Sequence, residues 1–139
     1  MVESRFFLDT NGWVALLNAS DGLHGASRAW WNRLILGGVA VVTTDWVIAE
    51  TGNGLAKSLA RVAFCEAVER LQGTPQTLVI EIDRQRRVAA LEFYRQRPDK
   101  DWGLVDCASF QVMNELAIRQ ALTNDRHFTQ AGFEALLRS

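Results

Sequence analysis

Few residues in this sequence are suited to disulfides or soft-metal sites: the 139 residues include two cysteines and two histidines. Cys65 and Cys107 lie far apart without CxxC spacing, so we expect two buried thiols in a reducing cytoplasm. No apolar run approaches the roughly 20 residues of a membrane helix, and residues 1–5 do not begin a signal peptide. We therefore expect a cytoplasmic protein without a membrane partner.

Excess charge of either sign is also missing, because the formal net charge is −1 and the pI is about 6.1. This balance argues against a protein that coats nucleic acid, although it allows a local basic patch. Apolar residues make up 48% of the chain and charged residues 22%, as in ordinary globular domains. The length predicts one domain over residues 1–139.

Short apolar runs alternate with amphipathic segments along the chain, which predicts an α/β fold. Strands are predicted at residues 6–8, 39–42, 77–80 and 118–122, and helices after Asp9 and at residues 23–36, 45–59, 61–71, 83–97 and 104–116. The tail, residues 127–137, is expected to hold a short helical turn and an edge strand. Strands connected through helices form a parallel sheet with helices on both faces.

Two acids directly follow predicted strands. Asp9 ends the run Phe6-Phe7-Leu8, and Asp125 follows residues 118–122. In open parallel sheets the ligand crevice lies beyond the carboxyl ends of the strands, so both acids are expected at that edge. An ordinary alternative for Asp125 is an Asx turn or a helix N-cap.

Two further acids are predicted on helices that begin at the same edge. Glu50 shares a helix face with Trp46 and Val47, and Asp106 lies in the first turn of the helix at 104–116. A salt bridge to arginine or partial exposure would also explain Glu50, and the helix dipole alone favours an acid at Asp106. Asp101 is either a helix cap or a further member of the set.

Together the four acids predict a metal site, because like charges gathered in one crevice resist ionising together. A divalent cation removes that difficulty, and carboxylate oxygens suit hard ions such as Mg²⁺ or Mn²⁺. No competing His/Cys ligand set exists, since His24 and His127 are the only histidines. His127 is placed either at the site or in loop packing.

Four motifs in order resemble those of PIN-domain ribonucleases, most closely the small VapC-like toxins of toxin–antitoxin pairs. They are Leu8-Asp9-Thr10-Asn11, Thr43-Thr44-x-x-Val47-x-x-Glu50, Asp101-x-x-Leu104-x-Asp106-Cys107-x-Ser109-Phe110 and Leu122-Thr123-x-Asp125-x-His127-Phe128, the last followed by Ala131-Gly132-Phe133. The resemblance implies a five-stranded parallel sheet and a metal-dependent endoribonuclease. It also implies a small antitoxin partner and a homodimer.

The resemblance assigns site residues by position in these motifs. The metal-binding and catalytic acids would be Asp9, Glu50, Asp106 and Asp125, with Asp101 as an additional acid of many members. Thr10 and Thr123 fall where the family often places a small hydroxyl residue near the site. Gly103 stands where the family usually has serine, which raises the question of how Asp106 is oriented.

Phosphates supply most of the affinity in RNA binding, and the segment after residue 83 is rich in arginine. Its cations are Arg84, Arg86, Arg87, Arg95, Arg97 and Lys100. They form either an RNA-contacting edge or a solvated charged face balanced by nearby acids. Trp102 is a candidate for stacking on a base.

Two other kinds of function remain open. An aspartyl phosphate on Asp9 fits poorly, because Asn11 stands where haloacid-dehalogenase-like phosphatases need a second acid. A receiver domain would need adjacent acids and a late lysine, and the only lysines are Lys57 and Lys100. A PIN-like module that binds RNA or protein without cleaving is the second alternative, and metal-stimulated cleavage would distinguish it from an enzyme.

Overall fold

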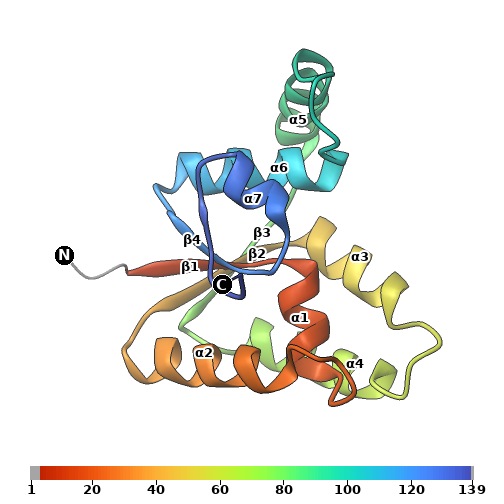
Figure 1. Ribbon diagram of the computed structural model, residues 1–139, viewed down its shortest axis with the longest axis vertical. Coiled ribbons are helices and arrows are strands. Elements are labelled where there is room, and N and C mark those ends of the chain that lie inside the picture. The colour runs from red at the N-terminus through yellow and green to blue at the C-terminus, as the bar shows by residue number, and fades with distance from the viewer. Residues whose placement is uncertain (1–3, 139) are drawn as a thin grey trace.

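Five parallel strands form the centre of the computed structural model, which describes residues 4–138 (Figure 1). The strands are β1 (Arg5–Leu8), β2 (Ala40–Thr44), β3 (Thr77–Ile80), β4 (Gln120–Leu122) and β5 (Glu134–Ala135). Their order across the sheet is β3-β2-β1-β4-β5, so β1 is the central strand. The predicted α/β class and the parallel sheet of five strands are confirmed.

Helices cover both faces of the sheet. They are α1 (Thr10–Leu17), α2 (His24–Leu36), α3 (Asp45–Gly54), α4 (Arg61–Gln72), α5 (Arg84–Gln96), α6 (Leu104–Glu115) and α7 (Arg126–Gln130). Figure 1 shows α1, α2 and α4 on one side and α6 and α7 on the other, while α5 projects from the body. Strands covered on both sides are apolar throughout rather than alternating. No helix of the described chain is long and apolar enough to span a bilayer.

The register of β1 determines which residues meet at the end of the sheet. Phe6 and Phe7 are fully buried, and Phe6 pairs with Val41 of β2. On the other side of β1, Leu8 pairs with Leu122 of β4. Because the strands are parallel, the segments that follow Leu8 and Leu122 emerge side by side.

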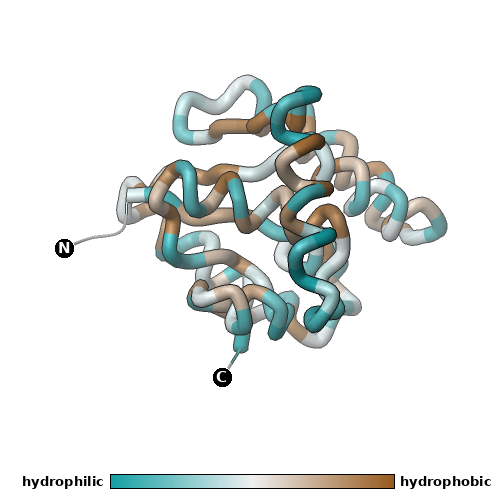
Figure 2. Tube along the Cα trace, turned by 90° about the horizontal axis from the view of Figure 1, so that it is seen from above, coloured by the Kyte–Doolittle hydropathy of each residue, from teal (hydrophilic) through white to brown (hydrophobic). Residues whose placement is uncertain are grey.

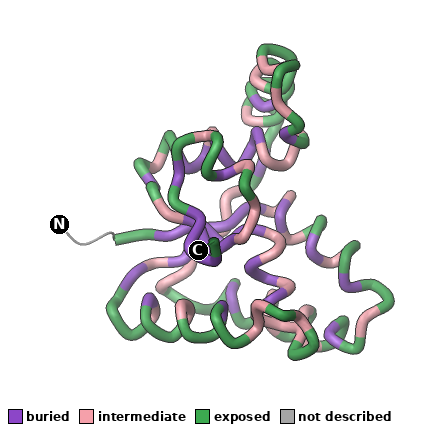
Figure 3. The backbone as a smooth tube through the Cα atoms, viewed as in Figure 1, coloured by how far each residue is buried: buried purple, intermediate pink, exposed green. Residues whose placement is uncertain are grey.

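Aromatic contacts link the helices to each other on both faces of the sheet. Trp13 of α1 meets Phe64 of α4 with ring centroids 6.1 Å apart, and Phe110 of α6 meets Phe128 of α7 at 4.9 Å. Buried residues therefore concentrate along the strands, and α5 is largely exposed (Figure 3). Helices show apolar segments next to hydrophilic ones, as expected for one-sided packing (Figure 2).

Several predicted boundaries are wrong by a few residues. Helix α3 ends at Gly54 rather than near residue 59, because Gly52 and Gly54 weaken its last turn and the chain then turns inward at the buried Leu55. Strand β4 begins at Gln120 rather than at residue 118. Cys107 is buried as expected, but Cys65 is exposed on α4, so that prediction was wrong for Cys65.

Gly12 permits the close approach of α1 to the end of β4. A Cβ atom on Gly12 would lie 3.0 Å from the carbonyl carbon of Leu122, closer still to its oxygen, and 3.3 Å from Cδ1 of Leu8. The first turn of α1 can therefore pack against the β4 backbone only without a side chain at this position. This contact brings the start of α1 next to the residues that follow β4.

We expect Gly12→Ala to lower the free energy of unfolding by about 1–3 kcal/mol, because the added methyl group must displace backbone rather than a flexible side chain. Gly25→Ala is the matched control, since Gly25 is an exposed glycine of α2 with no atom within 4 Å of an added Cβ. The control should raise stability by up to about 1 kcal/mol. Urea denaturation of both variants checks this, and equal effects would contradict the packing argument.

Candidate functional site

Asp9 lies at the junction of β1 and α1 and is 5% exposed. It occupies the N-cap position of α1, but its side chain does not cap the helix. Instead, its Oδ2 accepts a hydrogen bond of 2.8 Å from the Thr123 hydroxyl. The carboxylate thus faces the residues that follow β4.

Thr123 connects three residues at this edge. Its Oγ1 accepts a hydrogen bond from the Asp125 backbone N–H at 3.1 Å and lies 3.0 Å from Oδ1 of Asn11. A hydroxyl has one proton, so Thr123 donates to either Asp9 or Asn11 at a given moment. Asn11 Oδ1 also accepts a hydrogen bond of 2.8 Å from the Asn124 backbone N–H. This amide oxygen therefore keeps a hydrogen bond when the Thr123 hydroxyl donates to Asp9.

Asp106 and Asp125 lie close together, with His127 between them. Asp106 is in the first turn of α6, and Asp125 caps α7 by accepting from the His127 backbone N–H at 2.9 Å. The His127 ring Nδ1 lies 3.1 Å from Oδ2 of Asp106 and 3.4 Å from Oδ1 of Asp125. Each of the three residues offers a ligand atom, and these atoms all lie within 4.8 Å of one another. His127 is therefore at the site rather than only in loop packing.

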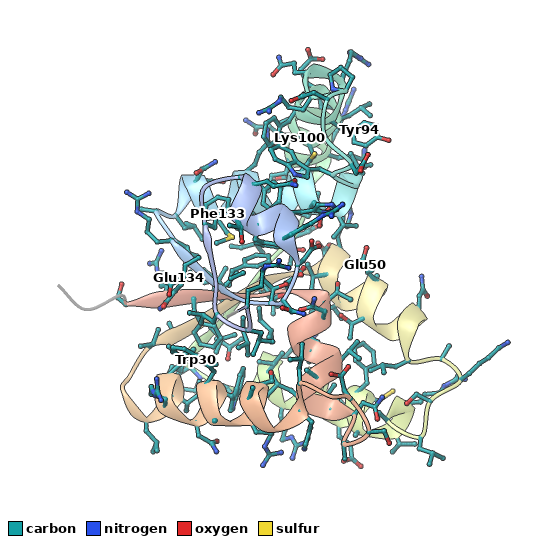
Figure 4. The ribbon with its side chains drawn as sticks, viewed as in Figure 1. Trp30, Glu50, Tyr94, Lys100, Phe133 and Glu134 are labelled. Carbon is teal, nitrogen blue, oxygen red and sulfur yellow. The ribbon has the colours of Figure 1, made fainter. Side chains whose placement is uncertain are left out.

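Glu50 reaches the same edge from α3, where its side chain is exposed (Figure 4). Its Oε1 accepts a hydrogen bond of 2.6 Å from the hydroxyl of Thr10, the residue after Asp9. The salt bridge to arginine considered for Glu50 does not form among the described residues. Because Thr10 directly follows Asp9, this hydrogen bond places Glu50 near Asp9, with the Thr10 side chain between them.

The surroundings of Asp9 and Asp106 raise the pKa of both carboxyl groups. Burial raises the pKa of Asp9 from 3.8 to about 7, and the charges of Asp106 and Asp125 add to that rise. Hydrogen bonds from Thr123 and the Thr10 backbone act in the opposite direction. The pKa of Asp106 is also raised, first by burial and then by the charge of Asp125. A bound cation would reverse these rises by stabilising the ionised forms.

The backbone of Gly103 fixes the orientation of the Asp106 carboxylate. The Gly103 backbone N–H donates to Oδ2 of Asp106 at 3.0 Å, which is one half of a capping box. The missing serine hydroxyl would supply only the other half. Asp106 is therefore held without it.

The structure does not bring Asp101 into the carboxylate cluster. Asp101 is exposed and forms no hydrogen bond or ion pair with the described residues. Trp102 beside it is 5% exposed and donates from its indole N–H to Gln130 at 3.1 Å. The prediction that Trp102 stacks on a base was wrong, because its ring is packed among other aromatic rings.

Three of the six predicted RNA-contacting cations are in ion pairs. Arg86 pairs with Glu115 at 2.9 Å, Arg95 with Glu92 at 2.8 Å and Arg97 with Asp99 at 3.0 Å. Arg84, Arg87 and Lys100 form no ion pair with the described part of the chain. The segment is thus a partly neutralised charged face with three available cations.

Sequence reasoning missed the role of Asn11, which ties the segment after β4 to the start of α1. The available signals were its position two residues after Asp9 and its place in the motif Leu8-Asp9-Thr10-Asn11. The bond between Thr123 and Asp9 joins residues 114 positions apart, so no local pattern reveals it.

A family model and a curated relative point to the same protein family. The family model described as PIN domain matches residues 6–134. The 23S rRNA-specific endonuclease VapC20 of Mycobacterium tuberculosis is 32% identical over 129 residues, which are 91% of this chain and 94% of the relative. The crystal structure of this VapC20, a sarcin–ricin loop cleaving toxin, matches with a TM-score of 0.82 and 27% identity over 92% of this chain and 95% of that chain.

Two more distant solved structures share the fold. VapBC2 of Rickettsia felis, solved bound to a DNA fragment from the promoter, matches with a TM-score of 0.66 and 15% identity over 94% of this chain and 96% of that chain. FitAcB of Neisseria gonorrhoeae matches with a TM-score of 0.62 and 20% identity over 94% of each chain. The family model covers nearly the whole sequence, and the sheet and the converging acids agree with it, so this chain belongs to the PIN domain family.

Proposed function

We propose that this protein is a metal-dependent endoribonuclease that hydrolyses RNA phosphodiester bonds, and that it is the toxin of a type II toxin–antitoxin module. The observation that carries the proposal is the buried Asp9 carboxylate, which faces the charges of Asp106 and Asp125. Asp106 and Asp125 also cap helices, but burying the Asp9 carboxylate beside their charges is unfavourable without a counter-charge, so the arrangement points to a bound cation. The 32% identity to an endonuclease toxin supports the same function.

The residues present fit a hard divalent ion, Mg²⁺ or Mn²⁺. Asp106 and Asp125, whose ligand atoms lie within 4.8 Å of one another, would supply carboxylate oxygens, the ligands that such ions prefer. Asp9 lies outside that group of atoms but interacts with the charges of both acids, and it would supply a third oxygen. Glu50 would join them through a water molecule. His127, which lies between Asp106 and Asp125, adds a nitrogen that Mn²⁺ accepts more readily than Mg²⁺ does. Asp101 is left out of this ligand set because it lies outside the cluster.

When bound, the ion would lower the pKa of a coordinated water and offset charge on the phosphate. The side chains have their own tasks in the same reaction. Thr123 orients Asp9 by a hydrogen bond, and Gly103 orients Asp106 through its backbone N–H. Thr10 occupies one oxygen of Glu50, which leaves the other oxygen free to accept a hydrogen bond from the attacking water and direct it at the phosphorus.

We propose ribosomal RNA as the substrate class, since the relative matched over nine-tenths of this chain is specific for 23S rRNA. Hydrolysis by a directed water would leave 5′-phosphate and 3′-hydroxyl ends, as the family resemblance implies. A module that binds RNA without cleaving it is the second candidate. All four principal acids are present and brought to one edge of the sheet, which favours the enzyme.

An antitoxin is proposed as the protein partner, because structural neighbours were solved as VapBC and FitAB complexes. Those neighbours are less than 25% identical to this chain and show its fold alone. The homodimer stays a prediction.

We expect Asp9→Asn to lower the rate of RNA cleavage by more than about 100-fold, beyond the loss typical for residues that only support a metal ligand. Asp21→Asn is the matched control, because Asp21 lies outside the site and its bond to the Leu23 backbone N–H suits an amide oxygen equally well. Cleavage of total RNA with and without EDTA, followed by sequencing of the new ends, measures both. Wild-type activity in Asp9→Asn, or cleavage that persists in EDTA, would rule out the proposed mechanism.

Asp9→Asn should also stabilise the metal-free fold. The folded-state pKa of about 7 exceeds the ordinary value of 3.8, so the folded state loses stability relative to the unfolded state as pH rises from about 4 to 7. At pH 8 we expect Asp9→Asn to melt at a higher temperature than the wild type, by about 2–4 °C for each kcal/mol of unfavourable Asp9 ionisation that the substitution removes. At pH 4 the two melting temperatures should differ little. Thermal denaturation in EDTA measures this.

Added Mn²⁺ should make the wild type melt at a higher temperature than Asp9→Asn, because it stabilises the wild type alone and a ligand that binds only the folded state raises its stability. An unchanged wild-type melting temperature over a Mn²⁺ titration, or a variant that melts lower than wild type at pH 8 in EDTA, would contradict this account.

A further inference from the structure

An open surface cavity of about 510 Å³ lies beside the projecting helix α5. Its lining includes Tyr94, Arg95, Arg97, Lys100, Trp102 and Gly103. The volume falls within the usual range for small-molecule sites, and the lining mixes an aromatic ring with cations. This composition differs from that of the carboxylate cluster.

The cavity adjoins the carboxylate cluster through Gly103. This residue forms part of the cavity lining, and its backbone N–H is bonded to Oδ2 of Asp106. In Figure 1 the segment between α5 and α6 runs from the tip of the projection down to the start of α6. The cavity and the carboxylate cluster therefore share Gly103 at their border.

The wall of the cavity is held rigidly by Trp102. Its ring meets Phe110 edge-on at 5.1 Å and Phe93 at 5.8 Å, and its indole N–H is bonded to Gln130. The guanidinium of Arg97 lies 5.1 Å from the centre of the same ring. The loop after α5 is thus fixed by contacts to α5, α6 and α7, and the cavity is formed in advance of any ligand.

Three groups in the lining, Tyr94, Lys100 and Asp101, form no side-chain hydrogen bond or ion pair within the described chain. Tyr94 is 49% exposed and its hydroxyl makes no hydrogen bond, and Lys100 forms no ion pair. Figure 4 shows both residues at the projecting end of the molecule, above the edge where Glu50 lies. Arg95 and Arg97, in contrast, are neutralised by Glu92 and Asp99. What remains available is the aromatic face of Tyr94, the Asp101 carboxylate and the Lys100 ammonium group. The pKa of Asp99 is lowered first by its hydrogen bond from Arg97 and also by the charge of Lys100.

We propose that this cavity holds an unpaired base of the RNA, close to the bond that is cut, with the base stacked on Tyr94 and a neighbouring phosphate bound by Lys100. Aromatic stacking plus a cation on the backbone is how proteins hold single-stranded nucleotides, since every base has a π-face. Asp101 is the carboxylate in the lining, and a base amino group is a donor whose hydrogen bond it would accept. The inference rests on the proposed endoribonuclease function and gives it a preference for unpaired segments.

Binding is measured in the Asp9→Asn background, which does not cut the probe. The probe is a fluorescein-labelled RNA hairpin carrying the sarcin–ricin loop of 23S rRNA, and a blunt duplex of the same stem serves as comparison. Tyr94→Ala should weaken hairpin binding by about 5- to 100-fold, the range for loss of one base stack. Tyr94→Phe should bind within about twofold of the parent, because stacking needs the ring and not the hydroxyl.

Lys100→Ala provides an independent readout. Losing one phosphate contact should reduce the slope of log affinity against log salt by about 0.7 to 0.9, whereas Tyr94→Ala should leave that slope unchanged. Val88→Ala is the control, since Val88 is an exposed residue of the same helix outside the cavity lining. It should alter neither affinity nor slope.

Equal hairpin affinities for the alanine and phenylalanine variants of Tyr94 would overturn the base-binding site, as would an equal loss of affinity for hairpin and duplex. Cleavage of total RNA by the otherwise wild-type protein separates the two proposals. Full cleavage by Tyr94→Ala with none by Asp9→Asn leaves the nuclease standing and rejects the site. No cleavage by the wild type rejects the nuclease itself.

Discussion

The hydrogen bond from Thr123 to Asp9 joins the ends of two neighbouring parallel strands, and the rest of the site depends on it. Because β1 and β4 pair through Leu8 and Leu122, the residues that follow them emerge together. The next residues along the chain then supply the carboxylate and the hydroxyl that holds it. The same hydroxyl oxygen positions Asp125 by accepting a hydrogen bond from the Asp125 backbone N–H. One side chain thus arranges two acids.

This arrangement is electrostatically unfavourable without a counter-charge. Burial and the neighbouring carboxylates raise the pKa of Asp9 to about 7, so the fold holds Asp9 partly neutral near neutral pH. A fold selected for stability alone would place an amide there. The same edge requires Gly12, since any side chain on it would collide with the Leu122 backbone. The unfavourable burial of the Asp9 carboxylate is thus the stability cost of the site, as in many active sites.

Much of the fold and the acidic cluster could be predicted from the sequence. Apolar runs that end at acids identify strands of a parallel sheet, and parallel strands bring their carboxyl ends to one edge. The role of Asn11 could not be predicted, and for His127 the sequence left the site and loop packing as equal alternatives, because both roles depend on contacts between segments distant in the chain. The surroundings of Trp102 were mispredicted for a similar reason: an indole beside an exposed acid is locally indistinguishable from one that packs against Phe110. The ion pairs of α5 also form partly with α6, which helical spacing alone cannot show.

We infer that Asp9, Asp106 and Asp125 together bind a divalent cation. The most direct test is anomalous diffraction from crystals of the wild-type protein soaked in Mn²⁺, collected alongside crystals of Asp9→Asn. The account predicts an anomalous peak within coordination distance of carboxylate oxygens of all three residues, at about 2.0–2.2 Å, and its loss or marked weakening in the variant. A wild-type crystal with no peak between these carboxylates, at a Mn²⁺ concentration that supports RNA cleavage, would contradict it.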